Sequence, residues 1–226
     1  MSVEAPPTAA RREVLRRRVR WIVAVTIGYN LVEAVIALAA GSIASSTALI
    51  GFGLDSTIEV LSAAAVAWQF TRREPERWEK GTLRVIAVAF FALAVYVTIS
   101  SVAALVLRTQ AEHSPVGIAL TAVSVAVMPL LSLAERRAGR ELGSATAVAD
   151  SKQTLICAYL SAAVLVGLVL NSLLGWWWVD AVAGLIIAAF AVREGVEASQ
   201  GDACATSVGM LLDDDDGHHD HGHHDH

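Results

Sequence analysis

Residues 49–68 read LIGFGLDSTIEVLSAAAVAW, an apolar segment of membrane-spanning length that contains two carboxylates, Asp55 and Glu59. A carboxylate near the centre of a bilayer costs about 2.5–3.5 kcal/mol on insertion scales, so such a residue faces a partner, a cavity or a substrate. Because the two residues are four apart, a helix presents both on one face. Two carboxylates that converge in a low-dielectric setting favour a divalent cation, which supplies the opposite charge. A buried structural hydrogen-bonded pair is the alternative.

The composition places the chain among integral membrane proteins. Of its 226 residues, 55% are hydrophobic and 17% are charged, and the mean hydropathy is +0.54. The arginines gather at the ends of apolar segments instead of along one helix face, which argues against a nucleic-acid partner. The two cysteines, Cys157 and Cys204, give no disulfide framework. Because no nucleophile–base pair, phosphate loop or zinc-hydrolase motif is present, we expect no enzymatic activity.

Uncharged segments predict the later spans directly. They are residues 85–107, residues 114–134, and the long stretch 153–179, which exceeds one span. Gly175, followed by three tryptophans suited to a membrane interface, breaks that stretch. Asp180 is expected either to cap or to open a last helix that runs to about residue 192. Pro129 is a candidate kink within its span.

The first seventy residues are compatible with two topologies. Residues 34–54 taken as one span would give five helices, whereas a turn-rich break at residues 41–47 separates spans 21–40 and 46–70 and gives six. The Lys/Arg bias decides between them. With six spans, fifteen of the seventeen basic residues face the cytoplasm, whereas five spans would export the basic loop 72–84. Six transmembrane helices with cytoplasmic N- and C-termini are therefore predicted.

The N-terminal region imitates a cleavable signal peptide, because a basic run at residues 11–20 precedes an apolar stretch and an A-x-A sequence at residues 37–39. Asn30 and Glu33 interrupt that apolar stretch, and further spans follow it. We therefore interpret residues 21–40 as an uncleaved first helix.

The predicted organisation is one all-α polytopic membrane domain between two polar ends. Residues 1–20 form a basic cytoplasmic segment, residues 21–194 the six-helix transport domain, and residues 195–226 a cytoplasmic tail. The tail carries six histidines interleaved with Asp and Gly: His218, His219, His221, His223, His224 and His226. Such a tract binds Zn²⁺, Cu²⁺ or Ni²⁺. Since expression tags are usually uninterrupted, a native metal-collecting tail is favoured over a tag.

Helical rise places polar side chains of two spans at one depth. At about 1.5 Å per residue, Asp55 lies roughly 14 Å below the outer start of its helix, and Cys157 lies roughly 14 Å above the inner start of its own. If these antiparallel helices are neighbours, Asp55 faces Cys157. Glu59 then faces Gln153. The sequence thus predicts a polar layer at mid-depth.

Five short motifs carry a family resemblance: NLVEA at residues 30–34, GSIAS at 41–45, DSTIE at 55–59, ADSKQ at 149–153 and WVDAVAGL at 178–185. Through them, residues 20–195 resemble the transmembrane domain of the cation diffusion facilitator family in span count, orientation and spacing. The cytoplasmic α/β domain usual in that family has no counterpart here, so its metal-sensing and dimerising roles are not carried over. Members of the family export Zn²⁺ or related divalent ions in exchange for protons. The resemblance implies an acidic pair on the second helix facing a His-x-x-x-Asp or Asp-x-x-x-Asp pair on the fifth.

The chain departs from that pattern on the fifth helix, where Gln153 and Cys157 occupy the expected ligand positions. An amide oxygen is a poor Zn²⁺ ligand, whereas a thiolate is a soft one. The expected ion is therefore Zn²⁺, with Cd²⁺, Co²⁺, Fe²⁺ and Mn²⁺ as alternatives, and not Mg²⁺ or Ca²⁺. Gln153 could equally form a hydrogen bond between helices, and Cys157 could be a small buried apolar residue.

Other polar residues have weaker claims to the site. Asn30 and Glu33 on the first span either line a cavity or pack helices. Asp150, near the cytoplasmic end of the fifth span, either attracts entering ions or stabilises a helix N-terminus. His113 is expected to be a solvated loop residue.

The combined prediction is a multi-pass divalent-cation exporter of the bacterial inner membrane, coupled to protons, with no resident cofactor. Its metal ligands would be Asp55, Glu59 and Cys157, completed by Gln153, Asn30 or water. Its partners would be the lipid bilayer, divalent metal ions and protons, while a homodimer is left open. The alternative is a non-transporting membrane protein that binds or senses metal, or a partner subunit.

Overall fold

The computed structural model describes residues 9–70, 75–142 and 145–200, and every regular element in these ranges is an α-helix. The helices are α1 (Ala9–Ala44), α2 (Thr47–Phe70), α3 (Pro75–Leu107), α4 (Pro115–Leu142), α5 (Ala145–Leu174) and α6 (Trp177–Gln200). The predicted all-α class and the six helices are therefore confirmed in the described part of the chain.

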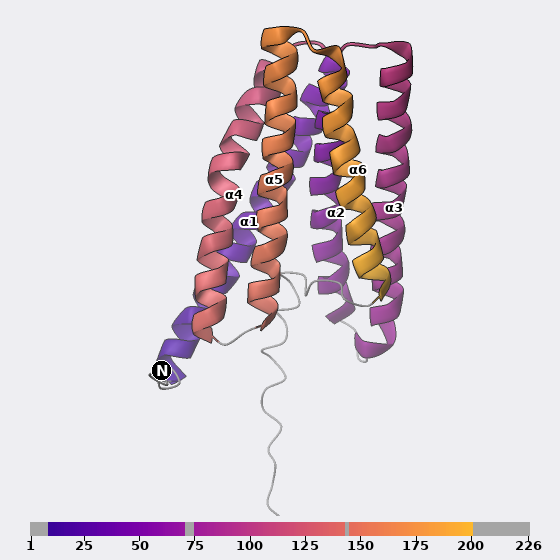
Figure 1. Cartoon of the computed structure of the whole chain (residues 1–226). Coiled ribbons are helices and arrows are strands. Elements are labelled where there is room, and N and C mark those ends of the chain that lie inside the picture. Colours follow the sequence, from indigo (N-terminus) through magenta and orange to yellow (C-terminus); the bar gives the residue numbers. More distant parts are fainter. Residues whose placement is uncertain (1–8, 71–74, 143–144, 201–226) are drawn as a thin grey trace, which may run out of the picture.

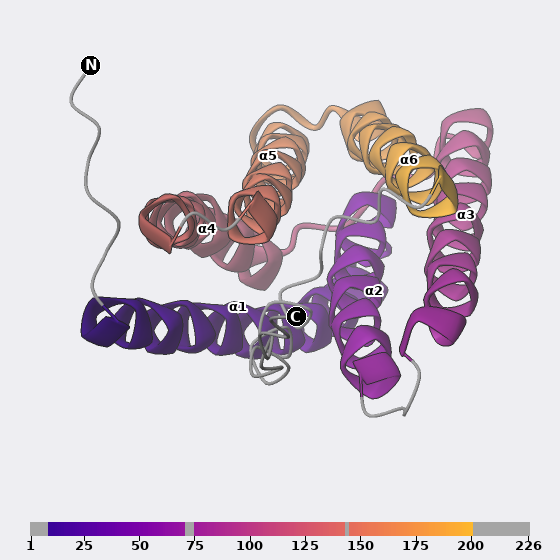
Figure 2. The same ribbon diagram turned by 90° about the horizontal axis from the view of Figure 1, so that it is seen from below.

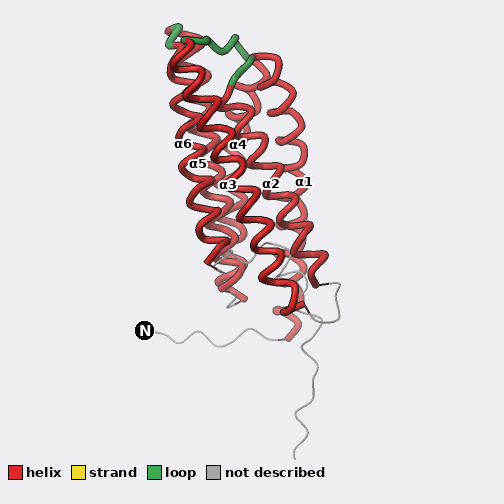
Figure 3. Tube along the Cα trace, turned by 90° about the vertical axis from the view of Figure 1, so that its right-hand side faces the viewer, coloured by secondary structure: helices red, strands yellow, loops and turns green. Residues whose placement is uncertain are grey.

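Successive helices run antiparallel within one bundle (Figure 1). The short connections that follow α1, α3 and α5 lie together at one end (Figure 3). Seen along the bundle, α4 packs against α5, α3 packs against α6, and α1 lies against both α2 and α4 (Figure 2). By contrast, α2 and α5 touch over a short length only. The two helices that carry the predicted ligands are thus neighbours with little packed surface between them.

Length and hydropathy agree with a membrane location. Five helices include a stretch long and apolar enough to cross a bilayer: Arg17–Ala44, Thr47–Ala65, Lys80–Leu107, Pro115–Glu141 and Ser151–Leu174. The sixth helix, α6, is as long as α2 and packs within the same bundle, but it carries Asp180, Arg193 and Glu194. Large apolar side chains such as Val85, Val88 and Ile99 point outward from α3, as expected for a surface that meets lipid.

The break between α1 and α2 confirms the six-helix topology over the five-helix alternative. α1 ends at Ala44, Ser45 has a positive φ of 51°, and α2 begins at Thr47. Gly41 allows this tight reversal, because a Cβ there would lie 2.9 Å from the backbone nitrogen of Ile50. The turn-rich pattern at residues 41–47 therefore marks a real helix boundary.

Other boundaries differ from the prediction in a consistent way. Gly175 ends α5 with a positive φ of 65°, as expected, but α6 begins at Trp177 and not at Asp180. Helices α1 and α3 begin before their apolar segments, and α6 continues to Gln200. The apolar pattern marks what fits in lipid, whereas backbone hydrogen bonds continue the helix into polar turns beyond it.

Asp180 caps a different helix from the expected one. Its Oδ1 accepts a 2.5 Å hydrogen bond from Ser46 Oγ, and its Oδ2 accepts from the backbone nitrogens of Thr47 at 2.8 Å and Ala48 at 3.4 Å. These are unsatisfied N–H groups of the first turn of α2. We call this interaction the Asp180 clamp. The sequence predicted a cap at Asp180, but the prediction that it caps its own helix was wrong.

Removal of the Asp180 clamp should destabilise the bundle. Asp180→Ala leaves two backbone donors and one hydroxyl buried without their acceptor, and loss of a helix cap costs about 0.5–2 kcal/mol. We expect a lower midpoint temperature of unfolding for the variant in detergent, measured by circular dichroism. Asp180→Asn, which keeps one acceptor oxygen, should lose less. Equal midpoints for wild type and Asp180→Ala would contradict a stabilising role.

Candidate functional site

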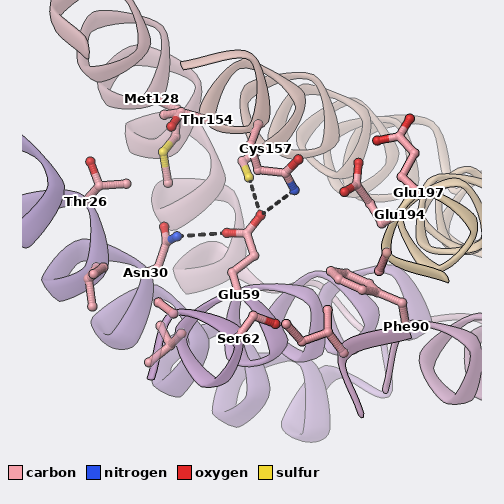
Figure 4. Close-up of a pocket in the computed structure, with 16 residues that line it drawn as sticks. Thr26, Asn30, Glu59, Ser62, Phe90, Met128, Thr154, Cys157, Glu194 and Glu197 are labelled. Carbon is pink, nitrogen blue, oxygen red and sulfur yellow. Dashed lines mark hydrogen bonds between the residues drawn. The ribbon is translucent and has the colours of Figure 1, made fainter. Parts of the chain in front are cut away.

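A cavity of about 90 Å³ lies within the bundle and is lined by side chains from all six helices. Its polar lining comes from α1, α2, α5 and α6: Thr26, Asn30, Glu59, Ser62, Gln153, Thr154, Cys157, Glu194 and Glu197. Phe90 of α3 and Met128 of α4 contribute apolar and thioether surface (Figure 4). A polar cavity with several acidic groups inside a membrane bundle is a candidate functional site.

Glu59 occupies the centre of this site (Figure 4). Its Oε1 accepts hydrogen bonds from Cys157 Sγ at 2.7 Å and from Gln153 Nε2 at 3.4 Å. Its Oε2 accepts from Asn30 Nδ2 at 2.8 Å. Four side chains from α1, α2 and α5 thus converge on one point. The predicted meeting of the acidic pair's helix with that of Gln153 and Cys157 is present in the structure.

The i, i+4 spacing on α5 explains why Gln153 and Cys157 share one acceptor, since it places both side chains on the same helix face. The expectation that Glu59 faces Gln153 is met. Cys157, however, donates to Glu59 and not to Asp55, which the depth estimate had paired with it. The offset is one helical turn, about 6 Å along the axis.

Asp55 is buried, with 7% of its surface exposed, but it is not part of the cavity lining. It lies one turn from Glu59 on α2, within electrostatic range of Glu59, Glu33 and Glu194. Asp55, the second carboxylate of the predicted pair, therefore lies behind the cavity wall. It is close enough to interact electrostatically with the carboxylates that line the cavity.

Glu33 belongs to a separate hydrogen-bonded cluster between α1, α2 and α4. Its carboxylate accepts hydrogen bonds from Ser56 Oγ at 3.1 Å and from the Ser124 hydroxyl, which also bonds to Tyr29 Oη. Glu33 is 1% exposed and is not among the residues that line the cavity. Of the two polar residues predicted on the first span, only Asn30 joins the site.

Two buried acids were not singled out from the sequence. Glu135 of α4 accepts hydrogen bonds from Thr26 Oγ1 at 3.0 Å and from Thr154 Oγ1 at 2.8 Å, and it supports one wall of the cavity. Glu194 of α6 lines the cavity directly. Both stand beside arginines in the sequence, Glu135 before Arg136 and Glu194 after Arg193. The signal that could have found Glu194 is the buried small-residue pattern of α6, which continues past residue 192 through Gly195 and Ala198.

Several predicted ligands fall outside what the structure describes. Asp150 lies within α5, but its side chain is outside the described part, and the tail histidines at residues 218–226 lie beyond the described residues. Among the side chains that are described, no group of three or more His, Cys, Asp or Glu is arranged to hold a metal ion. Instead, the donors of Cys157, Gln153 and Asn30 point at Glu59. Metal binding here stays a prediction.

Three curated proteins are similar to this chain. The cation-efflux pump FieF of Shewanella oneidensis is 33% identical over 79 residues, covering 35% of this chain and 26% of the pump. An uncharacterized transporter of Synechocystis is 25% identical over 173 residues, covering 71% and 55%. Transmembrane protein 163 of Xenopus laevis is 21% identical over 188 residues, covering 80% and 66%. The chain spans between about a quarter and two thirds of the length of these relatives.

A family profile described as the cation efflux transmembrane domain matches residues 23–199. That range runs from within α1 to the last turn of α6, so it takes in most of the described bundle and every residue that lines the cavity. Since the match covers more than half of the sequence and agrees with the six-helix fold, the chain belongs to the cation efflux transmembrane domain family.

Proposed function

We propose that this chain exports divalent metal cations, Zn²⁺ first among them, across a bacterial inner membrane in exchange for protons. Its family membership and the names of its relatives support cation efflux as the general activity. The observation that carries the proposal is the convergence of Asn30, Gln153 and Cys157 on the Glu59 carboxylate inside a membrane-buried cavity. A structural hydrogen-bonded pair would need neither the cavity nor a thiol.

The chemistry of the convergent groups suits a transported cation. In the structure, the thiol and two amides donate hydrogen atoms to Glu59. An arriving cation would replace these donors: Cys157 loses its proton to bind through sulfur, and the amides turn their oxygens inward. Because metal ligands must be deprotonated to bind, protons compete with the cation for the same atoms. Protonation from the outer side would then drive release of the cation.

The packing of the bundle supports alternating access. The α3–α6 and α4–α5 pairs each share extensive surfaces, whereas α2 and α5 meet over a short length beside the cavity. Relative motion of the pairs would open the cavity to one side or the other with little loss of packed surface. Interfaces with two stable arrangements are the usual basis of such transitions.

The sulfur of Cys157 favours soft cations. Thiolate ligands select Zn²⁺ and related thiophilic ions over Mg²⁺ and Ca²⁺, which prefer all-oxygen sites. Cd²⁺, Co²⁺, Fe²⁺ and Mn²⁺ are the alternatives to Zn²⁺ as cargo. The thioether of Met128, which also lines the cavity, adds a second soft group to the wall.

A second function is favoured by one observation. Because the described side chains hold no cluster of three His, Cys, Asp or Glu groups arranged for a metal ion, the site could bind cations weakly. The chain would then be a non-transporting membrane protein that binds or senses metal, or a partner subunit. Stoichiometric Zn²⁺ binding without flux in sealed vesicles would identify this case.

The two carboxylates of α2 test the transport function. Glu59→Ala removes the acceptor at the centre of the site, and Asp55→Ala removes the buried charge behind it. Each variant should abolish Zn²⁺ flux into proteoliposomes, measured with a trapped fluorescent Zn²⁺ indicator. Glu112→Ala, an exposed change in the loop before α4, should transport like wild type. Unchanged flux in either α2 variant would remove the basis of the proposal.

The thiol of Cys157 tests the ion preference. Cys157→Ser replaces a soft sulfur with a hard oxygen of similar size. Cd²⁺ flux should fall more than Mn²⁺ flux when both are measured in the same vesicle preparation. If the two fluxes fall by the same factor, Cys157 is not a thiolate ligand.

Exchange of Zn²⁺ for protons should change the lumenal pH of vesicles in one direction. When Zn²⁺ enters the lumen by antiport, protons leave it, so a trapped pH dye should report alkalinisation that follows Zn²⁺ addition. Glu59→Gln vesicles should show neither signal. Zn²⁺ entry at constant lumenal pH, in vesicles without a protonophore that hold an imposed pH gradient, would exclude antiport.

A further inference from the structure

The cavity holds a surplus of hydrogen-bond acceptors. In the described part of the chain, four buried side-chain polar atoms have no hydrogen-bond partner, and three of them are oxygens of residues that line this one cavity. They are Asn30 Oδ1, Gln153 Oε1 and Glu194 Oε1. A buried acceptor without a donor costs free energy, so three in one space indicate a ligand that attracts oxygen lone pairs.

Glu194 contributes most to this surplus because it alone of the three carries a formal charge. It is 9% exposed and projects from α6 into the cavity, across from Glu59 (Figure 4). The carboxylates of Glu59 and Asp55 lie within its electrostatic range. Glu59 of α2 and Glu194 of α6 therefore face the same small volume, which Glu197 of α6 also lines.

The backbone of α6 fixes Glu194 in this position. At the next residue, Gly195, a Cβ would lie 3.0 Å from Cε1 of Phe91, so α6 approaches α3 as closely as a glycine permits. Ala191 and Ala198 are buried on the same side of α6. This close packing leaves α6 little freedom to rotate and turn Glu194 away from the cavity.

We infer that Glu194 becomes a ligand of the transported cation when α2, α5 and α6 draw closer together than they are in this structure, so that Glu59, Cys157 and Glu194 then hold the ion. This inference rests on the proposed function, since it assumes that the cavity receives the cargo. A divalent cation bound between Glu59 and Glu194 gives the orphaned oxygen of Glu194 a partner and offsets the repulsion between the two carboxylates. Water could bond to the same oxygen, but it could not offset the charge.

The third ligand also links helices that belong to different packed pairs. Glu194 belongs to the α3–α6 pair, Cys157 to the α4–α5 pair and Glu59 to α2. A cation shared by all three would draw together the units whose relative motion the transport cycle requires. Glu194 would then couple occupation of the cavity to the arrangement of the bundle.

Zn²⁺ binding to the purified full-length chain tests this ligand. All variants carry alanine in place of the six tail histidines and Cys204→Ser, so that the tail loses its imidazole and thiol ligands. Glu194→Gln keeps the size of the side chain but removes its charge, and it should weaken Zn²⁺ binding at least about tenfold, since even outer-shell partners of metal ligands change affinity about 10–100-fold. Glu112→Gln should bind like this background. Competition with a chromophoric chelator measures the affinities, and thermal midpoints without metal confirm that each variant is folded.

A second readout does not respond to a merely structural role. Glu194→Cys would place a second sulfur on the ion, so the Cd²⁺-loaded variant should gain sulfur-to-metal charge-transfer absorbance over the same background. No gain in absorbance, or wild-type Zn²⁺ affinity in Glu194→Gln while Glu59→Gln loses binding, would overturn the Glu194 inference and leave the proposed function intact. Absence of Zn²⁺ binding in the background chain itself would overturn both.

Discussion

In a bundle that lies in lipid, a buried carboxylate has to find its hydrogen-bond donors on neighbouring helices, because the hydrocarbon supplies none. This constraint sorts the acids of the chain. Glu33 and Glu135 each accept from two hydroxyl groups, and Asp180 accepts from a hydroxyl and two backbone amides. These three acids are satisfied and hold helices together. Glu59 is bonded only to groups that can also bind metals, and Glu194 keeps one oxygen without a partner. None of the three satisfied acids, Glu33, Glu135 and Asp180, lines the cavity.

Helix packing is close between α3 and α6 and sparse between α2 and α5, where the cavity lies. Along α3 and α6, glycines allow close approach: a Cβ at Gly184 would come within 2.4 Å of Ser101 Oγ, and one at Gly195 would meet Phe91. Small residues at helix interfaces in membranes increase van der Waals contact, which replaces the hydrophobic driving force available in water. Between α2 and α5 no such extensive contact exists, and polar groups fill the gap. Rigid pairs thus surround a region that can rearrange.

Much of this arrangement could be predicted from the sequence, because it follows from local rules. The turn at Ser45 and the end of α5 at Gly175 come from turn-forming residues, and the placement of Gln153 and Cys157 on one face of α5 comes from helical spacing. That both of them bond to Glu59 was not predicted. What could not be predicted depends on which helix faces which. Asn30 turns to the cavity and Glu33 to α4, although they are three residues apart. Glu194 sits beside Arg193 and resembles a rim charge until the packing of α6 against α3 is known.

The Asp180 clamp has a mechanical consequence for the far end of the molecule. The Asp180 carboxylate accepts hydrogen bonds from Ser46 and from the first backbone amides of α2. The ends of α2 and α6 near the α1–α2 turn are therefore joined and would move together. Prying them apart would strand backbone N–H groups in a medium without water. Under the proposed export function, an exit on that side would open beside the joined helices, along the sparse contact of α2 with α5, and not between α2 and α6. Asp180, which does not line the cavity, would in this way determine which helix contact opens.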